Sequence, residues 1–260
     1  MIEEILSTIT YYAFPKKLTA EKGKMITNYV RKEIEVEENQ YFISIDIKGH
    51  ILGVLWLMLV VYRVDQKIYK HSYGNRIRSN LYNELSEEPT YSPYLFEPYF
   101  QQYESWRDKA MEEALHYLRS GQDVVVLTLD FKRFFYSLDI SVELMEELYK
   151  EAELEDDENL RAVNDFVFQV ISGYASLFGE FVGSNILPIG FVPSNVLSNY
   201  ALRNFDQAVL DGFNPIYFGR YVDDVIIVDK IGSNSDLYKK SIHEELEADH
   251  IITFFLEQCS

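Results

Sequence analysis

The sequence Ile216-Tyr-Phe-Gly-Arg-Tyr-Val-Asp-Asp-Val-Ile-Ile-Val228 decides the fold of the chain, because it places two adjacent carboxylates inside an apolar run. The aromatic and β-branched residues on both sides of Asp223 and Asp224 predict strand, turn and strand. Acids in such a run are at least half-buried, and burying an unpaired charge costs several kcal/mol or more. A divalent cation would neutralise them; the alternative is an acidic turn that faces solvent.

Another acid ends an apolar strand earlier in the chain. Residues 124–129 read Val-Val-Val-Leu-Thr-Leu, and Asp130 follows. If this strand lies beside the hairpin of residues 216–228, three carboxylates meet at one edge of a sheet, where their mutual repulsion requires cations. Oxygen ligands without nearby His or Cys favour Mg²⁺ or Mn²⁺, and two ions ~3.5–4 Å apart suit in-line phosphoryl transfer. Taken alone, Asp130 is also explained as a helix-capping residue.

The composition predicts a folded, cytoplasmic protein. The 260 residues are 47% hydrophobic and 15% aromatic, which is enough for a core and excludes a disordered chain. The single cysteine, Cys259, excludes an intrachain disulfide framework and suits a reducing compartment. No N-terminal signal pattern is present, and the most apolar stretch, residues 51–62, is shorter than the ~20 residues that cross a bilayer. We expect a buried helix there, and no membrane.

The formal charge of −18 is unusual for a nucleic-acid-binding protein, whose contact surface is usually basic. The acids are concentrated in residues 143–158 and 244–249, which we expect to be solvated faces. Basic residues gather in other segments: residues 16–32, residues 67–78, and the pair Lys132 and Arg133. The sequence therefore predicts a weak basic lining for a ligand.

The order of predicted elements is that of an α+β protein. We expect helices in residues 1–35, 51–62, 101–120, 141–149, 160–174, 193–210 and 235–248, and strands in residues 41–46, 124–129, 216–221, 224–228 and 251–256. Ser141 is expected to cap its helix, Gly121 to end one, and residues 187–190 to form a turn. From residue 121 onward this order suits an antiparallel sheet with helices on one face.

Three motifs together resemble those of reverse transcriptases. Asp130-Phe-Lys-Arg-Phe-Phe-Tyr-Ser-Leu-Asp139, Leu187-Pro-Ile-Gly-Phe-Val-Pro-Ser194 and Tyr221-Val-Asp-Asp224 occur in the order of motifs A, B and C of that family. The resemblance covers about residues 70–256. With Tyr73-Gly-Asn-Arg-Ile-Arg78 and the Leu-Pro-Ile-Gly form of motif B, the chain looks most similar to the bacterial defence-associated, abortive-infection-type enzymes.

The resemblance implies a right-hand polymerase with fingers and a palm, the palm being an antiparallel sheet backed by helices. The implied ranges are residues 1–120 for N-terminal helices and fingers, 121–150 for the palm with motif A, 151–186 for a helical insertion, and 187–260 for the palm with motifs B, C and D. A thumb is absent from this plan. A second protein, a further domain, a structured RNA or a homo-oligomer would have to supply it.

The resemblance also implies roles for single residues. Asp130 and Asp223 would hold two Mg²⁺ or Mn²⁺ ions, Asp224 would assist them, and the carbonyl of Phe131 would complete a metal's coordination. Phe135 matches the aromatic gate that excludes a ribose 2′-hydroxyl and so implies deoxynucleotides. The alternative role for Phe135 is that of an ordinary core phenylalanine, and this role suits the neighbouring Phe134 better.

The other implied contacts are with the incoming dNTP and with nucleic acid. The dNTP-binding candidates are Arg76, Arg78, Lys132, Arg133, Phe135, Gly190 and Tyr221. The template or primer candidates are Ser194, Asn195 and Asn199. Guanidinium groups suit phosphate oxygens, although either arginine of the fingers is also explained as a surface residue paired with acids. Glycine at position 190 would permit close backbone approach, and Asn199 is also explained as a polar residue satisfied by its own helix.

The sequence departs from the family pattern at four points. Ile189 stands where many reverse transcriptases have glutamine, and Asn195 replaces a common proline. No lysine follows Asp249 to protonate pyrophosphate, and His250 is the candidate to replace it. The fourth departure is the absent thumb.

The expected function is an RNA-directed or untemplated DNA polymerase in antiphage defence, which uses dNTPs and works with a template or noncoding RNA. Two other classes stay open: a catalytically silent scaffold that binds nucleic acid or a partner protein, and a palm-type nucleotidyltransferase or cyclase. The intact set of three acids argues against the scaffold. The cyclase leaves Phe135 and the Leu-Pro-Ile-Gly turn without an explanation.

Overall fold

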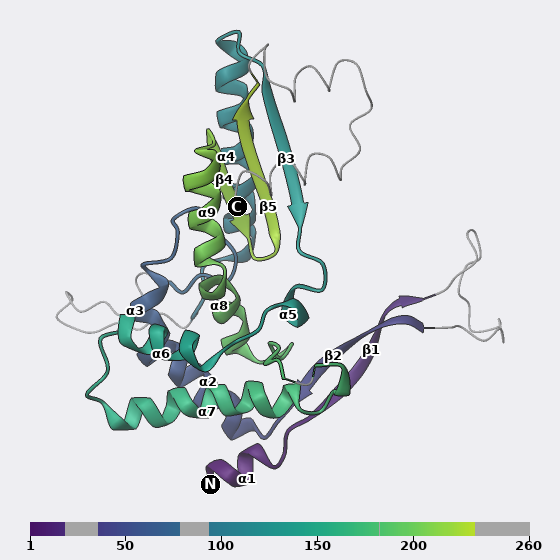
Figure 1. Cartoon of the computed structure of the whole chain (residues 1–260), viewed down its shortest axis with the longest axis vertical. Coiled ribbons are helices and arrows are strands. Elements are labelled where there is room, and N and C mark those ends of the chain that lie inside the picture. The colour runs from purple at the N-terminus through teal and green to yellow at the C-terminus, as the bar shows by residue number, and fades with distance from the viewer. Residues whose placement is uncertain (19–35, 79–93, 182, 232–260) are drawn as a thin grey trace. The chain divides into compact units, whose positions relative to one another are not determined.

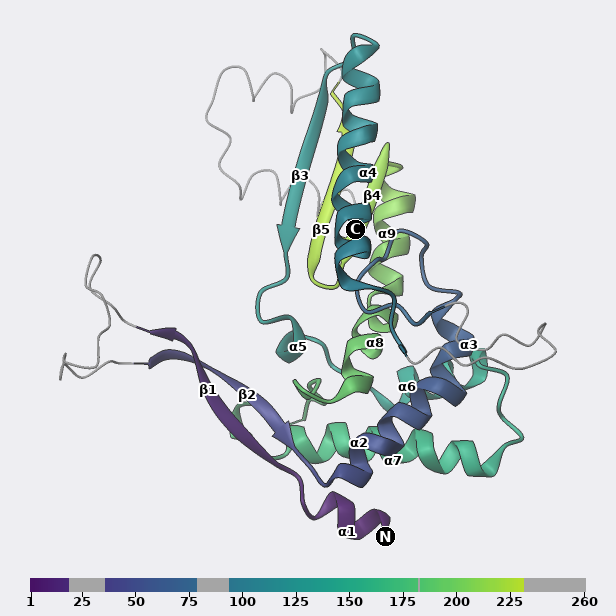
Figure 2. The same ribbon diagram turned by 180° about the vertical axis from the view of Figure 1, so that it is seen from behind.

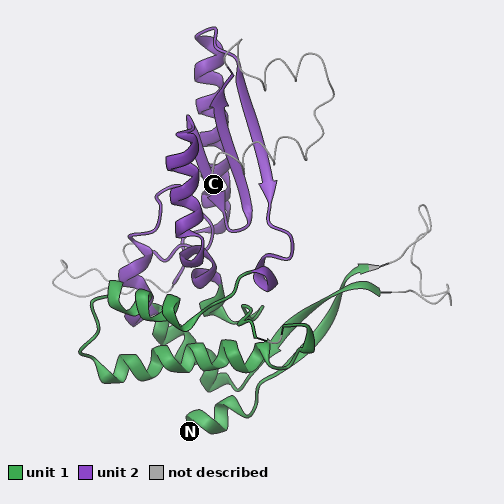
Figure 3. Cartoon of the chain, viewed as in Figure 1, with its two compact units in different colours: residues 1–57, 138–194 green, residues 58–137, 195–260 purple. Residues whose placement is uncertain are grey.

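The structure, a computed structural model, describes residues 1–18, 36–78, 94–181 and 183–231 (Figure 1). The chain divides into two compact units, residues 1–57 with 138–194 and residues 58–137 with 195–260 (Figure 3). The described residues form a mixed α+β structure, as expected, but their strands form two small antiparallel sheets where the sequence predicted one. The predicted helix of residues 235–248 and strand of residues 251–256, with His250 and Cys259, lie outside the described residues.

The first unit contains a β ribbon where the sequence predicted a helix. After the short helix α1, Ile2–Leu6, strand β1, Thr10–Leu18, pairs with β2, Val36–Ser44. The prediction of a helix through residues 10–18 is therefore wrong, whereas the strand expected at residues 41–46 is confirmed. Aromatic rings of the two strands pack together, Tyr11 on Tyr41 and Phe14 on Phe42, and such cross-strand pairs stabilise a ribbon that local periodicity does not reveal.

Three helices form the core of the first unit: α2, Ile47–Trp56; α6, Val142–Glu151; and α7, Glu158–Ala175. A short 3₁₀ turn, η2, covers Gly179–Phe181. The predicted cap is confirmed, because the hydroxyl of Ser141 accepts from the N–H of Leu144 at 3.1 Å. Trp56 is fully buried and its Nε1 donates to Oδ1 of Asn164 on α7 at 2.9 Å, which joins α2 to α7.

The apolar helix is longer than expected. α2 continues through a π-helical turn, Leu57–Val61, into α3, Tyr62–Asp65. This run has 19 residues and a mean hydropathy of 1.6, so by length and composition alone it could cross a membrane. Core helices of soluble proteins share these features. Its expected burial is confirmed for Trp56 and Val60, both 0% exposed, but not for Ile51, which is 52% exposed; the absence of a membrane stays a prediction.

The second unit is built on a three-stranded antiparallel sheet of order β3-β5-β4. Its strands are β3, Val124–Asp130; β4, Tyr217–Tyr221; and β5, Asp224–Lys230. The central strand β5 pairs along its length with β3 and with β4. The predicted strand and hairpin are therefore confirmed.

Helices cover both faces of this sheet, whereas the sequence predicted one face. Ile226 and Val228 of β5 pack with Trp106 and other residues of α4, Tyr99–Arg119, which Figure 2 shows running along the sheet. Val225 and Ile227 pack on the opposite side with Val209 of α9, Arg203–Phe213. Successive strand residues point to opposite faces, so an uninterrupted apolar strand can bury both. The α4 prediction is confirmed, and Gly121 with φ +80° follows its C-terminus.

The predicted helix of residues 193–210 is two helices, α8, Val192–Ala201, and α9. The break falls at Leu202, and the boundary between the two units lies within α8, after Ser194. A short helix, α5, Phe134–Ser137, follows β3 in the second unit.

Candidate functional site

The acidic turn, residues 221–224, joins β4 to β5. Tyr221 and Asp224 lie opposite each other in the register, so Val222 and Asp223 form the tip. Val222 has a φ of +58°, a left-handed conformation that is rare for a β-branched residue. Because the pleat is interrupted there, the two acids are not constrained to opposite faces as they would be in a regular strand.

Asp130 lies at the same end of the sheet as the acidic turn. It is the last residue of β3 and is directly opposite Asp224 on β5. The N–H of Phe131 donates to the carbonyl of Asp223 at 3.4 Å. Opposed residues of an antiparallel pair have Cα atoms about 4.5–5.5 Å apart and side chains on the same face. The backbone thus brings Asp130, Asp223 and Asp224 together.

Electrostatic repulsion acts within these three acids. Burial raises the pKa of Asp224, and the negative charges of Asp223 and Asp130 raise it further. Across the described ranges, no group of three His, Cys, Asp or Glu side chains is arranged to hold a metal ion. The placement and the oxygen donors fit a divalent cation, which would favour the ionised carboxylates, but the side chains are not in the positions of a closed metal site.

Tyr221 faces aromatic residues of α4. Its ring contacts those of Tyr99, Tyr103 and Trp106 at centroid distances of 5.6, 5.4 and 5.9 Å, and only 8% of the residue is exposed. Burial, followed by the neighbouring Tyr99 and Tyr103, raises the pKa of Tyr221 to about 12. The predicted dNTP contact is thus a tyrosine packed against a helix.

The residues after Asp130 form an aromatic turn. Phe134 is buried, 4% exposed, whereas Phe135 is half-buried, so the sequence was right that Phe134 fits a core role better. The two rings meet edge to face at 5.5 Å. Lys132 and Arg133 are exposed. Phe135, Lys132 and Arg133 thus belong to the same unit as the three acids, within five residues of Asp130.

The two arginines of the predicted fingers differ in setting. Arg76 donates from Nε to both carboxylate oxygens of Asp65, at 3.2 and 3.1 Å, and from Nη1 to the carbonyl of Ser72 at 2.8 Å. Burial raises the pKa of Asp65, and the charge of Arg76 opposes that rise. Arg78 donates to the carbonyl of Phe96 at 3.1 Å. Arg76 is therefore engaged by the protein itself in this structure.

The buried arginine of this site, Arg220, was missed by sequence reasoning. It precedes Tyr221 on β4, its side chain is 0% exposed, and it forms a bidentate ion pair with Asp206 of α9. It also bonds to Asn199, which is fully buried and donates to the carbonyl of Gly74 at 2.6 Å. The sequence feature that could have revealed this buried ion pair is a lone arginine in an otherwise apolar strand. Both partners of the Asn199 side chain, Arg220 and Gly74, lie outside α8, so the alternative that Asn199 is satisfied by polar residues of its own helix is wrong.

The remaining template and dNTP candidates belong to different units. Gly190 and Ser194 lie in the first unit, where Gly190 has a φ of +90° and the Ser194 hydroxyl donates to the carbonyl of Pro188 at 2.7 Å. Asn195 is half-buried and belongs to the second unit. Their contacts with nucleic acid stay predictions.

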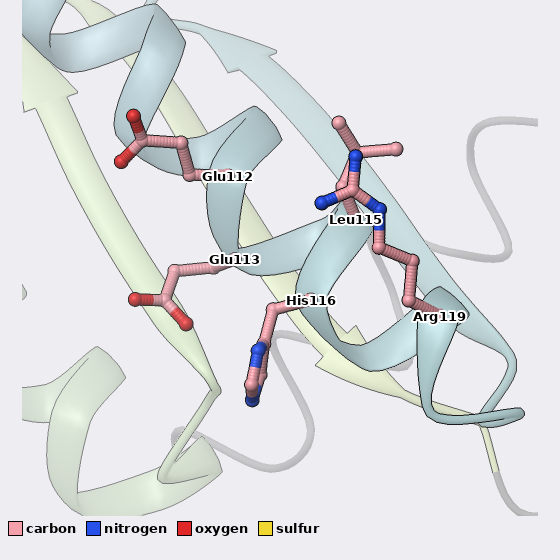
Figure 4. Close-up of a pocket in the computed structure, with 5 residues that line it drawn as sticks. All are labelled: Glu112, Glu113, Leu115, His116 and Arg119. Atoms are coloured by element: carbon pink, nitrogen blue, oxygen red, sulfur yellow. The ribbon is translucent and has the colours of Figure 1, made fainter.

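A separate pocket lies along α4 (Figure 4). Its described lining consists of Glu112, Glu113, Leu115, His116 and Arg119, all from that helix. None of these residues was a predicted site residue, and the pocket therefore adds nothing to the acidic turn.

Comparison of the sequence with models of known families found no match, and comparison with curated proteins found none either. The residues of the acidic turn and their geometry are therefore what indicates a function for this chain.

Proposed function

We propose that this chain is a reverse-transcriptase-type DNA polymerase that adds dNTPs by two-metal phosphoryl transfer, in the cytoplasm and in antiphage defence. The observation that supports the proposal most is the register of β3 and β5, which sets Asp130 opposite Asp224 at the acidic turn. The proposal includes two things that the order of the motifs implies by resemblance. They are the right-hand plan of fingers and palm, and the likeness to the bacterial defence-associated group.

Bound Mg²⁺ or Mn²⁺ would lower the pKa of an attacking hydroxyl and stabilise the leaving pyrophosphate. Asp130, Asp223 and the carbonyl of Phe131 are the residues that would hold the ions, with Asp224 beside them. Phe135 would limit the space at the sugar 2′ position. Exposed Lys132 and Arg133 would attract the triphosphate.

The net charge of −18 makes a further partner part of the proposal. An acidic surface repels a nucleic-acid backbone beyond the few basic residues near the site. We infer that a further domain, a second protein, a copy of this chain or a structured RNA helps to hold the duplex.

The main test measures nucleotide incorporation. Purified protein receives Mg²⁺ and labelled dNTPs, with and without co-purified RNA, and wild type is compared with Asp223→Ala plus Asp224→Ala. We expect labelled polymer from wild type and a loss of several orders of magnitude in the double variant, because the ions stabilise most of the transition-state charge. Asp229→Asn, at the other end of β5, is the matched control and keeps its activity.

Other outcomes of this test point to the other two classes. Incorporation by neither protein contradicts the proposal and favours a binding scaffold. Cyclised ribonucleotide in place of polymer favours a primer-independent nucleotidyltransferase.

Phe135→Ala tests the sugar gate. Because it removes the ring beside the sugar, we expect the variant to incorporate ribonucleotides that wild type rejects. Phe134→Leu, which changes the buried ring of the same helix, should keep the discrimination. Unchanged discrimination in Phe135→Ala would contradict the gate assignment.

A further inference from the structure

Arg220 uses every donor of its guanidinium group inside the protein. Nε and Nη2 each donate to one carboxylate oxygen of Asp206 at 2.9 Å. Nη1 donates to Oδ1 of Asn199 at 2.9 Å and to the carbonyl of Val222 at 3.0 Å, and Nη2 donates to the carbonyl of Asn199 at 3.3 Å. Five N–H groups thus meet five acceptors, and the side chain has none left for a ligand.

One of these five acceptors belongs to the acidic turn. The carbonyl of Val222 lies between the predicted dNTP contact Tyr221 and the predicted metal ligand Asp223. Val222 is the residue with a φ of +58°, a strained conformation that a β-branched residue keeps only where its surroundings hold it. The bond from Arg220 is such a restraint, because it fixes the peptide unit that follows the strained residue.

A second segment holds the turn from the other side. The N–H of Arg220 donates to the carbonyl of His71, and the N–H of Tyr73 donates to the carbonyl of Arg220. A Cβ added to Gly74 would lie 2.5 Å from Cγ2 of Val222, so a side chain at position 74 would require Val222 to move. Asn199, which accepts from Arg220, also donates to the carbonyl of Gly74. Arg220 and Gly74 therefore both lie against Val222, Arg220 by a hydrogen bond to its carbonyl and Gly74 by close packing.

We propose that Arg220, charge-balanced by Asp206, is a positioning residue that holds the acidic turn in the conformation that presents Asp223 and Asp224 to metal ions. This proposal depends on the proposed function for its catalytic consequence, but not for its structural one. Bidentate pairing with Asp206 fixes the plane of the guanidinium, and the fixed plane directs Nη1 at the carbonyl of Val222. A lysine could neutralise Asp206 but could not reach both acceptors with that geometry.

The test replaces both charges together. Arg220→Met plus Asp206→Leu removes the pair without leaving an unpaired buried charge, so we expect the fold to persist, with an unfolding temperature within roughly 5 °C of wild type. Hydrogen exchange of residues 221–225 should become about tenfold faster or more, since exchange reports local opening. The exposed pair Arg161 and Glu146, 2.9 Å apart, gives the matched control, Arg161→Met plus Glu146→Leu, with unchanged exchange at the turn.

The same variants are assayed for incorporation with Mg²⁺. We expect kcat to fall about 100-fold while the KM for dNTP changes little, because a small displacement of metal ligands affects the reacting geometry more than nucleotide binding. Arg220→Lys, which keeps a charge beside Asp206, serves if the double variant does not fold, and it should show faster exchange at the turn as well.

The outcomes separate this proposal from the proposed function. Unchanged exchange at residues 221–225 in the folded variants would overturn the positioning role, whatever the activity. Faster exchange in a protein whose wild type incorporates no nucleotide would support the role of Arg220 and contradict the polymerase. Faster exchange with wild-type kcat would show that the turn geometry does not matter for the reaction and would overturn the catalytic consequence.

Discussion

Asp206 and Asp224 belong to the same compact unit but lie beside opposite charges. Asp206 is 1% exposed and faces Arg220 in a bidentate pair. Asp224 is half-buried, and its pKa is raised first by burial and then by the negative charges of Asp223 and Asp130. A buried acid that serves the fold has an arginine from the chain itself. Acids placed beside other acids call for a positive charge from outside, and a divalent cation is the simplest source.

Replacing Asp130 should separate function from stability most strongly. Asp130→Asn removes one predicted metal ligand from an exposed position, so we expect nucleotide incorporation to fall at least about 1,000-fold. Stability should be unchanged or slightly higher, because one source of repulsion toward Asp224 is removed. Incorporation assays and thermal unfolding on the same preparation check both expectations. Normal activity in Asp130→Asn would contradict the proposal that this site is a two-metal centre.

Replacing Asp206 should have the opposite profile. Asp206→Ala leaves the guanidinium of Arg220 buried without its counter-charge, and breaking a buried pair in this way costs about 3–5 kcal/mol. Denaturant unfolding measures the loss, with Asp211→Ala, an exposed acid on the same helix, as the control that changes little. A loss as small as that of the control would mean that the pair is not required for the fold.

The comparison also explains what the sequence could and could not reveal. The acidic turn and the end of β3 were predicted because each depends on local pattern, an apolar run interrupted by Asp223 or ended by Asp130. The partner of Arg220 was not, because Asp206 lies on another element and its choice depends on how α9 packs on the sheet. The helix prediction for residues 10–18 failed for the same reason, because the pairing of β1 with β2 is a tertiary contact that leaves no local signal.

Divalent cations should stabilise the protein only through the acids of the turn. Binding to the folded state alone adds RT ln(1 + [L]/Kd), about 2.7 kcal/mol at a concentration of 100 Kd. We expect Mg²⁺ or Mn²⁺ to raise the unfolding temperature of wild type by several degrees and to leave Asp223→Ala plus Asp224→Ala unchanged. Thermal scans with and without the ion test this. An equal rise in both proteins would place the binding elsewhere.

Alkaline pH should reveal a smaller difference between the two faces of the sheet. The pKa of Tyr221 beside α4 and that of Tyr69, which stacks on Phe218 on the α9 side, are both raised by burial to about 12. A folded pKa above the unfolded value near 10 means that each tyrosine contributes full stability below pH 10 and loses it as pH rises toward 12. We expect a loss on the order of 1 kcal/mol per tyrosine across that window. Unfolding midpoints at pH 8, 10 and 11.5 should fall less steeply in Tyr221→Phe and in Tyr69→Phe than in wild type. If Tyr221→Phe falls as steeply as wild type while Tyr69→Phe does not, the packing of α4 does not shield the hydroxyl of Tyr221 from water.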